Sequence, residues 1–504
     1  MWPVWTLDEA RAADRVAQDE GVPFQALLSA AGLQLARYVN QRVPKGPVVV
    51  LAGPGSNGGD GWVAAWHLAA RRPVAVVPVL NPQFAGADGW VKAATARGVR
   101  IVNGADGEES LKHAAVVVDA VFGTGFHGLV MESPAGPWLK RLEDLGTPVV
   151  AADMPSGIDT NTGAYDGPQP NALATVAMGA AKWGHVAYPG TAFIGDLVVA
   201  DIGLSRRAFG DPPASFVEPG WAARHLPRVG RLAHKYERGR VAVVGGSRAM
   251  PGAPVLSAWA CLKAGAGLVE MVVPDSAGIG VSMPPALIRY RVPETAGGSL
   301  TWSPELKKAI ERADALVIGP GMGSGVEPRV LKELAALKIP AVLDADGIGA
   351  AKAAGIALPP EWVMTPHAGE LARFLDRDRG AVDSDRRQAV LDAAKAARGA
   401  VLLKGRFTVI SDGGEIRINP TGTQVLATAG SGDVLSGIAA RLLAGGLRGI
   451  DALALAAFWH GWAGELGEEA QDLSLTADDL WHWIGPAARA IREERPVSRV
   501  LFWD

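Results

Sequence analysis

The residues best suited to chemistry lie in the stretch ATAGSGDVLSG, from Ala427 to Gly437. Its glycines and small hydroxyl residues leave backbone N–H groups free to bind an anion such as a phosphate. Asp433 opens an amphipathic helical pattern, DVLSGIAARLLAG, whose dipole would strengthen that attraction. A carboxylate beside a phosphate can take a proton from an attacking hydroxyl, so the stretch predicts Asp-assisted phosphoryl transfer to an alcohol. The alternative is that Asp433 is only an acidic residue in a first helical turn.

Three other motifs of the same half could complete such a site. KGRFT, from Lys404 to Thr408, follows an apolar run and offers a cation and a hydroxyl to a phosphate, unless it is only a solvated strand end. GPGMG, from Gly319 to Gly323, would let the backbone pass close to a ligand, which alone is a weak signal. TPHAGE places His367 between a predicted strand and a predicted helix, where a lone histidine is more often structural than functional. The pattern GxxxxGK[ST] is absent, which excludes a P-loop enzyme.

Glycine-rich loops follow three apolar runs in the first half of the chain. They are GPGSNGGDG (Gly53–Gly61), DAVFGTGFHG (Asp119–Gly128) and DMPSGIDTNTG (Asp153–Gly163). Asn57, Asp119 and Ser156 offer hard oxygen ligands, which suit an alkali or alkaline-earth cation better than zinc or copper. Asp153 is a candidate acid or base at a strand end. Because these residue types also favour turns, a purely structural role is the alternative.

Both halves of the chain alternate short β-branched runs with glycine-rich turns and alanine-rich helical patterns. Continuously apolar runs such as VVVLA and AAVVV are typical of strands buried on both faces of a parallel sheet. A stretch with scattered prolines and no sustained periodicity, SRRAFGDPPASFVEPGWAARHLPRVGRLAHKYERG, separates the two halves. We therefore predict two α/β domains, one over residues 1–215 and one over residues 216–504.

The composition excludes several classes of protein. Hydrophobic residues make up 48% and the net charge is −3, which argues against disorder and against non-specific nucleic-acid binding. The one cysteine, Cys261, cannot form an internal disulfide. The N-terminus lacks the basic and apolar regions of a secretory signal, and no apolar run reaches the roughly 20 residues of a membrane span. We expect a cytoplasmic protein with neither a nucleic acid nor a membrane as partner.

The order of motifs resembles a known family. GRVAVVGGS, VIGPGMG, DADG, TPHAGE, LLKGRFT, NPTG and ATAGSGDVLSG resemble the ADP/ATP-dependent NAD(P)HX dehydratase, which is ribokinase-like. SNGGDG, FGTG and DMPSGID resemble the NAD(P)HX epimerase, which implies a Rossmann-like three-layer first domain. Together they resemble the family in which both enzymes are fused. The resemblance implies metabolite repair: the R and S hydrates NADHX and NADPHX are interconverted, and the S form is phosphorylated and dehydrated at the expense of ADP or ATP.

The resemblance also implies roles for individual residues and ions. Asp433 would be the base of the dehydratase and Asp153 the acid or base of the epimerase. K⁺ would be bound by Asn57, Asp119 and Ser156, Mg²⁺ would act in the dehydratase domain, and the chain would form a homo-oligomer. Substrate would be contacted by Ser56, Asn57, Gly58, Gly59, Asp60, Gly123, Thr124, Gly125, Phe126, His127, Gly128 and Leu129, and in the second domain by Ala253, Gly323 and His367. The adenine nucleotide would be contacted by Lys404, Gly405, Arg406, Phe407, Thr408 and Gly432.

Two positions depart from the pattern of the epimerase. Ser56 stands where the family usually has the first Asn of NNGGDG, and Ala30 stands where LMENAG has Asn. The main alternative function is a ribokinase-like small-molecule kinase with an accessory nucleotide-binding domain, and a further one is a binding protein whose first domain has lost catalysis. A single-chain fusion favours ADP, although the sequence leaves ADP and ATP open.

Overall fold

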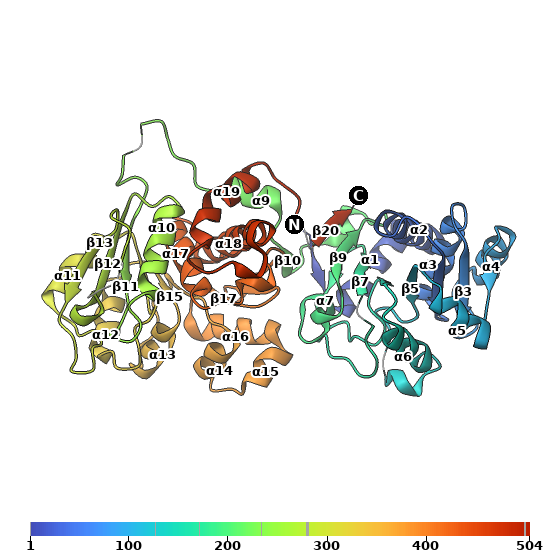
Figure 1. Cartoon of the computed structure of the whole chain (residues 1–504), viewed down its shortest axis with the longest axis horizontal. Helices are drawn as coiled ribbons and strands as arrows, with labels where there is room; N and C mark the ends of the chain where they lie inside the picture. The colour runs from blue at the N-terminus through green and yellow to red at the C-terminus, as the bar shows by residue number, and fades with distance from the viewer. Residues whose placement is uncertain are drawn as a thin grey trace. The chain divides into compact units, whose positions relative to one another are not determined.

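The chain forms two compact units. The structure, a computed structural model, describes residues 2–126, 128–170, 172–232, 234–278, 282–497 and 500–503. One unit comprises residues 2–212 together with the last residues of the chain, from 498 onward, and the other comprises residues 213–497. We call them the N-terminal unit and the C-terminal unit (Figure 1).

The N-terminal unit is built on an eight-stranded sheet with the order β20-β9-β7-β6-β5-β2-β3-β4, in which all neighbouring strands are parallel. The strands are β2 (Val48–Ala52), β3 (Val74–Pro78), β4 (Arg100–Ile101), β5 (Val116–Ala120), β6 (Val149–Ala152), β7 (Ala172–Met178), β9 (Asp196–Ala200) and β20 (Val500–Trp503). A separate parallel pair is formed by β1 (Val4–Trp5) and β8 (Ala181–Lys182). The order runs outward in both directions from β2 and β5, so connections diverge at these two strands and leave a crevice beyond their carboxyl ends, where such sheets bind ligands.

Helices cover both faces of this sheet. Val48 and Val50 face one hydrophobic core, whereas Val49 and Leu51 face a second core on the other side of the same strand. The first core contains residues of α1 (Leu7–Asp19), α2 (Phe24–Arg42), α3 (Ser56–Leu68), α4 (Ala87–Ala96) and α8 (Arg206–Phe209), and the second contains residues of α5 (Gly104–Lys112) and α6 (Gly136–Leu145). The short α7 covers Trp183–Val186. Two cores around one parallel sheet confirm the predicted three-layer α/β arrangement.

The stretch predicted as the loop GPGSNGGDG is helical from Ser56 onward, because α3 begins there. Its glycines allow this helix to pack very closely. A Cβ atom on Gly58 would lie 1.9 Å from the carbonyl oxygen of Gly53, and one on Gly61 would lie 2.7 Å from Cβ of Ala120. Larger residues would therefore push α3 away from the carboxyl ends of β2 and β5. The residues from Ser56 onward, predicted to lie in a loop, are therefore held in a helix.

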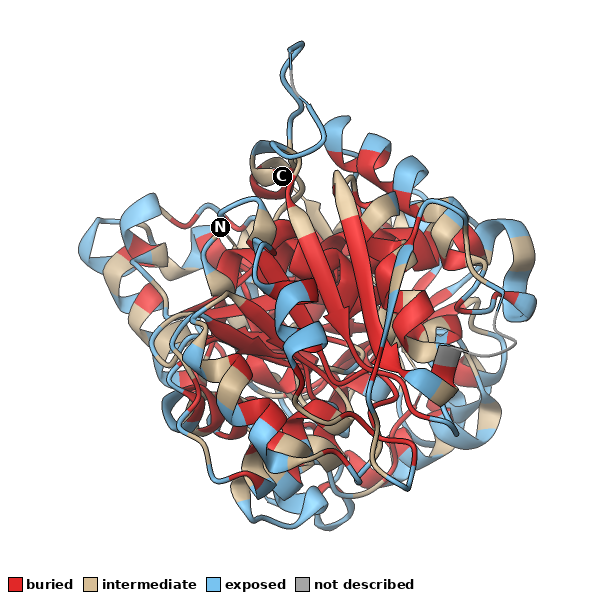
Figure 2. Ribbon diagram, turned by 90° about the vertical axis from the view of Figure 1, so that its left-hand side faces the viewer, coloured by how far each residue is buried: buried red, intermediate tan, exposed pale blue. Residues whose placement is uncertain are grey.

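The C-terminal unit contains a ten-stranded sheet with the order β10-β19-β18-β17-β16-β15-β14-β11-β12-β13. Its strands are β10 (Ala214–Phe216), β11 (Arg240–Val244), β12 (Leu268–Pro274), β13 (Ile288–Val292), β14 (Ala315–Ile318), β15 (Ala341–Leu343), β16 (Trp362–Met364), β17 (Val401–Leu403), β18 (Thr408–Ser411) and β19 (Ile416–Asn419). Only β18 runs antiparallel to its two neighbours among these strands. Most of its strands are buried, as the red strands in Figure 2 show, whereas the edge strand β13 is mostly exposed. The α/β prediction is therefore confirmed for this unit as well.

The helices of the C-terminal unit lie on both sides of its sheet (Figure 1). They are α9 (Pro219–His225), α10 (Ala253–Lys263), α11 (Pro304–Ile310), α12 (Pro328–Ala336), α13 (Asp346–Ala353), α14 (Ala368–Leu375), α15 (Arg379–Ser384), α16 (Arg386–Ala397), α17 (Ser431–Ala444), α18 (Gly449–Gln471) and α19 (Leu480–Arg492). Helix α17 packs against α10, α18 and strands β11, β14 and β15. Helix α18 is almost entirely buried. No described helix is long and apolar enough to cross a membrane.

The predicted domain assignment needs a correction at the end of the chain. Everything after residue 215 was assigned to the second domain, but β20 pairs in parallel with β9 of the N-terminal unit. Aromatic contacts hold it there: Phe502 stacks on Trp2 with ring centroids 4.9 Å apart, and Trp503 meets Tyr38 edge-on at 5.5 Å. A strand so distant in sequence from its partner has no local signal that reveals the pairing.

Candidate active sites

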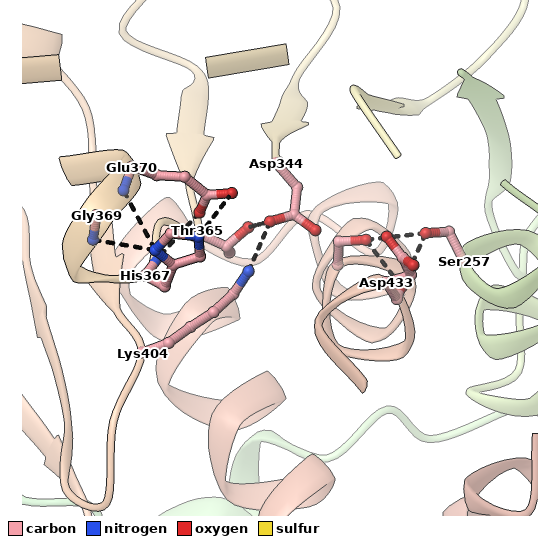
Figure 3. A network of polar contacts seen from close by, with 9 residues as sticks. Ser257, Asp344, Thr365, His367, Gly369, Glu370, Lys404 and Asp433 are labelled. Carbon is pink, nitrogen blue, oxygen red and sulfur yellow. Dashed lines mark hydrogen bonds and ion pairs between the residues drawn. The ribbon is translucent and has the colours of Figure 1, made fainter. Parts of the chain in front are cut away.

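Helix α17 of the C-terminal unit carries Asp433 in its first turn, directly after the glycine-rich stretch. The preceding Gly430 has a φ of 89°, a left-handed conformation that suits glycine. The hydroxyls of Ser257 and Ser436 each donate a hydrogen bond of 2.8 Å to the backbone carbonyl of Asp433. Figure 3 shows the Ser257 bond, which comes from the neighbouring α10. The backbone that carries the carboxylate is therefore fixed from two sides.

Lys404 reaches the same region from the end of β17. Its Nζ donates a hydrogen bond of 2.7 Å to Oδ1 of Asp344, which also accepts one of 2.9 Å from Oγ1 of Thr365 (Figure 3). A Cβ atom on Gly432 would lie 3.0 Å from Lys404 Nζ, so the ammonium group borders the beginning of α17. The site thus combines a cation, carboxylates and the N–H groups of a helix terminus. They come from the ends of β15, β16 and β17 and from the beginning of α17.

The charges of this site leave Asp433 ready to accept a proton. Burial and the nearby Asp344 carboxylate raise the pKa of Asp433 to about 7, although Lys404 opposes the shift. A base works best when its pKa lies near the working pH. Burial alone would lower the pKa of Lys404, but Asp344, Glu370 and Asp433 outweigh it and raise that pKa, so the lysine stays charged. The site can bind an anion and take a proton beside it.

His367 has a structural task in this region. It caps α14, where its Nδ1 accepts hydrogen bonds of 3.0 Å from the N–H of Gly369 and 3.2 Å from the N–H of Glu370. In return the Glu370 carboxylate accepts a 2.8 Å bond from the N–H of His367. Nδ1 is thus the acceptor, which puts the proton of a neutral ring on Nε2. The structural interpretation accounts for this histidine, and its contact with a substrate stays a prediction.

Two other predicted contacts, Gly323 and Ala253, lie after strands of the same unit. Gly323 has a φ of 73° and donates a hydrogen bond of 2.8 Å to Oδ2 of Asp346. Ala253 is the first residue of α10 and lies beside Gly321, whose added Cβ would come within 3.0 Å of it. Neither residue contributes a side-chain group that could take part in chemistry, and their contact with a substrate stays a prediction.

The motif KGRFT is divided between the surface and the core. Phe407 is buried and packs against Phe216 with ring centroids 6.0 Å apart. Thr408 donates its hydroxyl to the carbonyl of Gly405 at 3.1 Å, whereas Gly405 itself is exposed. The Arg406 guanidinium lies over the Phe407 ring, 5.9 Å from its centroid. Of this motif, Lys404 is the group that joins the network around Asp433.

Sequence reasoning missed several members of the C-terminal site. Asp344 and Thr365 follow β15 and β16, and their positions at strand ends in DADG and TPHAGE were the available signal. His460 of α18 contacts the first residue of α17, because its Nε2 lies 3.2 Å from Oγ of Ser431. Burial lowers the pKa of His460 to about 4, which keeps the ring neutral. No sequence pattern relates residue 460 to residue 431.

The N-terminal unit contains a cavity of about 640 Å³ at the carboxyl ends of β2, β5 and β6. Most predicted residues of the first domain line it, namely Ser56, Asn57, Asp60, Gly123, Thr124, Gly125, Phe126 and Asp153. Gly58 and Gly59 instead pack against neighbouring elements. Gly128 and Leu129 are not among the lining residues, and His127 lies outside the described residues. Other residues that line the cavity, among them Asp14 of α1 and Lys182, are not among the predicted site residues.

Asp153 is held at the end of β6 by an unusual set of contacts. Its φ of 59° lies in the left-handed region, which is rare for a residue with a side chain. Its Oδ1 accepts a 3.0 Å hydrogen bond from the N–H of Met178 and forms an ion pair with Lys182. Its backbone carbonyl lies 2.7 Å from Nε2 of His185. Such a strained and firmly held carboxylate is typical of a functional site.

The predicted cation ligands lie together beside the cavity. Asp119 accepts hydrogen bonds from Ser156 at both carboxylate oxygens, 2.6 Å from Oγ and 2.9 Å from N. The Oδ1 and Nδ2 atoms of Asn57 are buried, and neither has a hydrogen-bond partner among the described residues. Buried polar groups are usually hydrogen-bonded, so the Asn57 amide is an exception in this part of the unit. Within the described part of the chain, no group of three or more His, Cys, Asp and Glu side chains could hold a metal ion.

Asp60 adds a second acidic group to this cavity. It is buried, and burial together with the Asp153 carboxylate raises its pKa well above the ordinary value. Lys182 opposes that shift. The cavity therefore combines a paired carboxylate with a carboxyl group that tends to hold its proton.

Comparison with known proteins agrees with this division of the chain. A family model described as NAD(P)H-hydrate dehydratase matches residues 241–485, and one described as YjeF-related protein N-terminus matches residues 24–184. The bifunctional NAD(P)H-hydrate repair enzyme Nnr of Moorella thermoacetica is 35% identical over 97% of both chains. Its counterpart from Pyrobaculum aerophilum is 36% identical over 94% of this chain and 95% of its own.

A solved structure resembles part of the chain. The ADP/ATP-dependent NAD(P)H-hydrate dehydratase from Bacillus subtilis, co-crystallized with ATP/Mg²⁺, is 24% identical, covers 55% of this chain and 98% of its own, and gives a TM-score of 0.47. The relationship rests on the relatives that match nearly the whole length. With more than 30% identity along almost all of both chains, this chain belongs to the family of bifunctional NAD(P)H-hydrate repair enzymes.

Proposed function

We propose that the N-terminal unit interconverts the R and S forms of NADHX and NADPHX, and that the C-terminal unit dehydrates the S form at the expense of ADP or ATP. The observation that carries the proposal is the presence of a separate acid–base site in each unit, one around Asp153 and one around Asp433. Similarity to the Moorella enzyme along 97% of both chains supports the same assignment.

In the C-terminal unit, the chemistry begins at the ring hydroxyl of the S hydrate. Asp433 takes the hydroxyl proton while the oxygen attacks the terminal phosphoryl group of the nucleotide. Lys404 and the free N–H groups beside Gly432 hold the phosphates, since both lie at the beginning of α17. The new phosphate ester then leaves as phosphate, and loss of a proton from the adjacent carbon restores the dihydronicotinamide. The net reaction is an elimination, although the base and the phosphate-binding groups are of the kind that a kinase uses.

Mg²⁺ fits this site through its hard oxygen donors. Asp344, Asp346 and Asp433 lie close enough to one another for the first two to raise the pKa of the third. Mg²⁺ usually keeps several water ligands and needs only one or two carboxylates in addition to substrate phosphates. When bound, it would neutralise charge on the phosphoryl group that is transferred.

In the N-terminal unit, Asp153 is the proposed acid or base. Inverting the hydroxylated carbon requires one of its bonds to break and to form again on the opposite face, with a proton removed and returned. Asn57, Asp119 and Ser156 would hold K⁺, and the buried, unpartnered amide of Asn57 fits an ion with oxygen ligands. When bound, K⁺ would supply positive charge near the substrate.

Recovery of dihydronicotinamide absorbance from a mixture of R and S NADHX tests the proposal. The mixture is incubated with ADP, with ATP and with neither, in potassium and in sodium buffer. We expect complete recovery that requires a nucleotide, with the conversion of the R fraction faster in potassium. Recovery that stalls at the S fraction would contradict the isomerase assignment, where Ser56 and Ala30 depart from the family pattern. No recovery with either nucleotide would contradict the dehydratase and favour a small-molecule kinase.

A further inference from the structure

Lys182 is a buried lysine whose ammonium group borders the N-terminal cavity, and no predicted role includes it. We propose that Lys182 is a positioning residue for the isomerisation: it holds Oδ1 of Asp153 so that Oδ2 is the oxygen that exchanges a proton with the substrate. The inference rests on the proposed role of Asp153 and adds the residue on which that role depends.

The contacts of Asp153 separate its two oxygens. Oδ1 accepts the N–H of Met178 at 3.0 Å and pairs with Nζ of Lys182. Nζ also donates a hydrogen bond of 2.9 Å to the carbonyl of Met178, which fixes the ammonium group in place. Among the described residues, none donates a hydrogen bond to Oδ2. Because Asp153 lines the cavity, Oδ2 is the oxygen free to meet a substrate.

The backbone around Lys182 is fixed as firmly as its side chain. In the parallel pair of β1 and β8, Lys182 is the register partner of Trp5. Its N–H donates a 2.9 Å hydrogen bond to Nδ1 of His185, and Nε2 of His185 lies 2.7 Å from the carbonyl of Asp153. Burial lowers the pKa of His185 to about 4, so the ring is neutral with its proton on Nε2. The His185 ring is therefore hydrogen-bonded to the backbone of Lys182 through Nδ1 and to the backbone of Asp153 through Nε2.

The charge around the cavity gives this lysine more than a packing role. The carboxyl groups of Asp153, Asp60 and Asp14 come from three different elements, and the charge of Lys182 acts on the latter two as well. Arg11, which lines the cavity, and Arg15, which acts on Asp14, are both exposed residues of α1. Replacing both partners of a buried ion pair by apolar residues is often neutral for stability, whereas removing one partner leaves the other charge buried without compensation. Replacing Lys182 alone would release Oδ1 and leave the carboxylates without their buried cation.

The test uses the full-length chain and its own dehydratase as an internal reference. With a nucleotide and mixed R and S NADHX, recovery of absorbance has a fast phase for the S form and a slow phase limited by conversion of the R form. We expect K182M to slow the second phase by about 100-fold, the lower range for loss of a general acid or base. The first phase should stay unchanged. The effect should appear in kcat with little change in KM, and K182R should restore part of the rate because it keeps a buried donor for Oδ1.

Matched variants separate the possible outcomes. K92M removes an exposed lysine of the same unit and should leave both phases unchanged. A K182M chain with a normal slow phase would overturn the inference, and so would one that raises KM alone. If K182M fails to fold, K182R decides: a folded K182R chain that keeps a higher kcat than D153N supports positioning by charge, and one as inactive as D153N contradicts it. D153N itself tests the proposed function. A normal slow phase in D153N would show that Asp153 is not the acid or base of the isomerisation, which would contradict the proposed function and not only the role of Lys182.

Discussion

The two units contain similar groups that are paired differently. In each unit, a lysine lies among several carboxylates that come from strand ends and from neighbouring helices. In the N-terminal unit, Lys182 pairs directly with Asp153, the proposed acid or base. In the C-terminal unit, Lys404 pairs with Asp344 and leaves Asp433 without a cationic partner among the described residues. The two sites therefore differ in whether the lysine pairs with the proposed acid or base or with a neighbouring carboxylate.

The difference corresponds to the chemistry of each unit. Burial and the nearby Asp344 carboxylate raise the pKa of Asp433 to about 7, so it can remove a hydroxyl proton at neutral pH. Lys404 is partly exposed and borders the helix terminus, where we propose that it binds phosphate. Lys182 is buried and paired with Asp153, which we propose that it positions. In this account, a lysine binds a ligand in one unit and positions an acid or base in the other.

The largest expected effect comes from removing the unpaired base. D433N should lower kcat/KM for dehydration of the S hydrate by about 10²- to 10⁴-fold, because an amide cannot accept the hydroxyl proton. Isomerisation, followed by chiral separation of the R and S forms, should proceed at the wild-type rate. A D433N chain that dehydrates normally would show that another group is the base.

A smaller effect should follow from removing the lysine of the same unit. K404M should raise KM for ADP or ATP about 10- to 100-fold, since a hydrogen bond to a charged group contributes roughly 1.5–3 kcal/mol. The control K332M removes an exposed lysine of α12 and should change nothing. If K404M left KM unchanged and lowered only kcat, Lys404 would resemble Lys182, and the contrast between the two lysines would fail.

The smallest effect concerns the pH dependence of dehydration. The base must be unprotonated, so kcat/KM should rise with pH and reach half of its maximum near pH 7, the pKa of Asp433. Asp344 raises that pKa, so D344N should move the midpoint to lower pH. Rate measurements at saturating nucleotide across the pH range check this. A midpoint that moves upward would contradict the assigned sign of the Asp344 interaction.

The strand ends were the part of both sites that could be predicted from the sequence. Apolar β-branched runs indicate buried parallel strands, and polar residues after them indicated Asp153, Asp119 and Lys404. The structure places these residues at the carboxyl ends of β6, β5 and β17, as expected.

The partners of these residues could not be predicted in the same way. Lys182 belongs to a two-residue strand whose pairing with β1 joins distant parts of the chain, and nothing in GAAKWGH indicates an ion pair with Asp153. The helical geometry of SNGGDG was also missed, because glycines favour loops unless close packing requires them, and close packing is a tertiary property. The pairing of β20 with β9 is equally non-local.

The central claim is that each unit carries a complete site of its own, and mixing two inactivated chains tests it most directly. Mixed R and S NADHX is incubated with nucleotide and D153N, D433N or both proteins at equal concentration. The account predicts recovery of only the S fraction with D153N at early times, no recovery with D433N, and complete recovery with the mixture. A mixture that stops at the S fraction would contradict it, because the two sites would then depend on one another within a single chain.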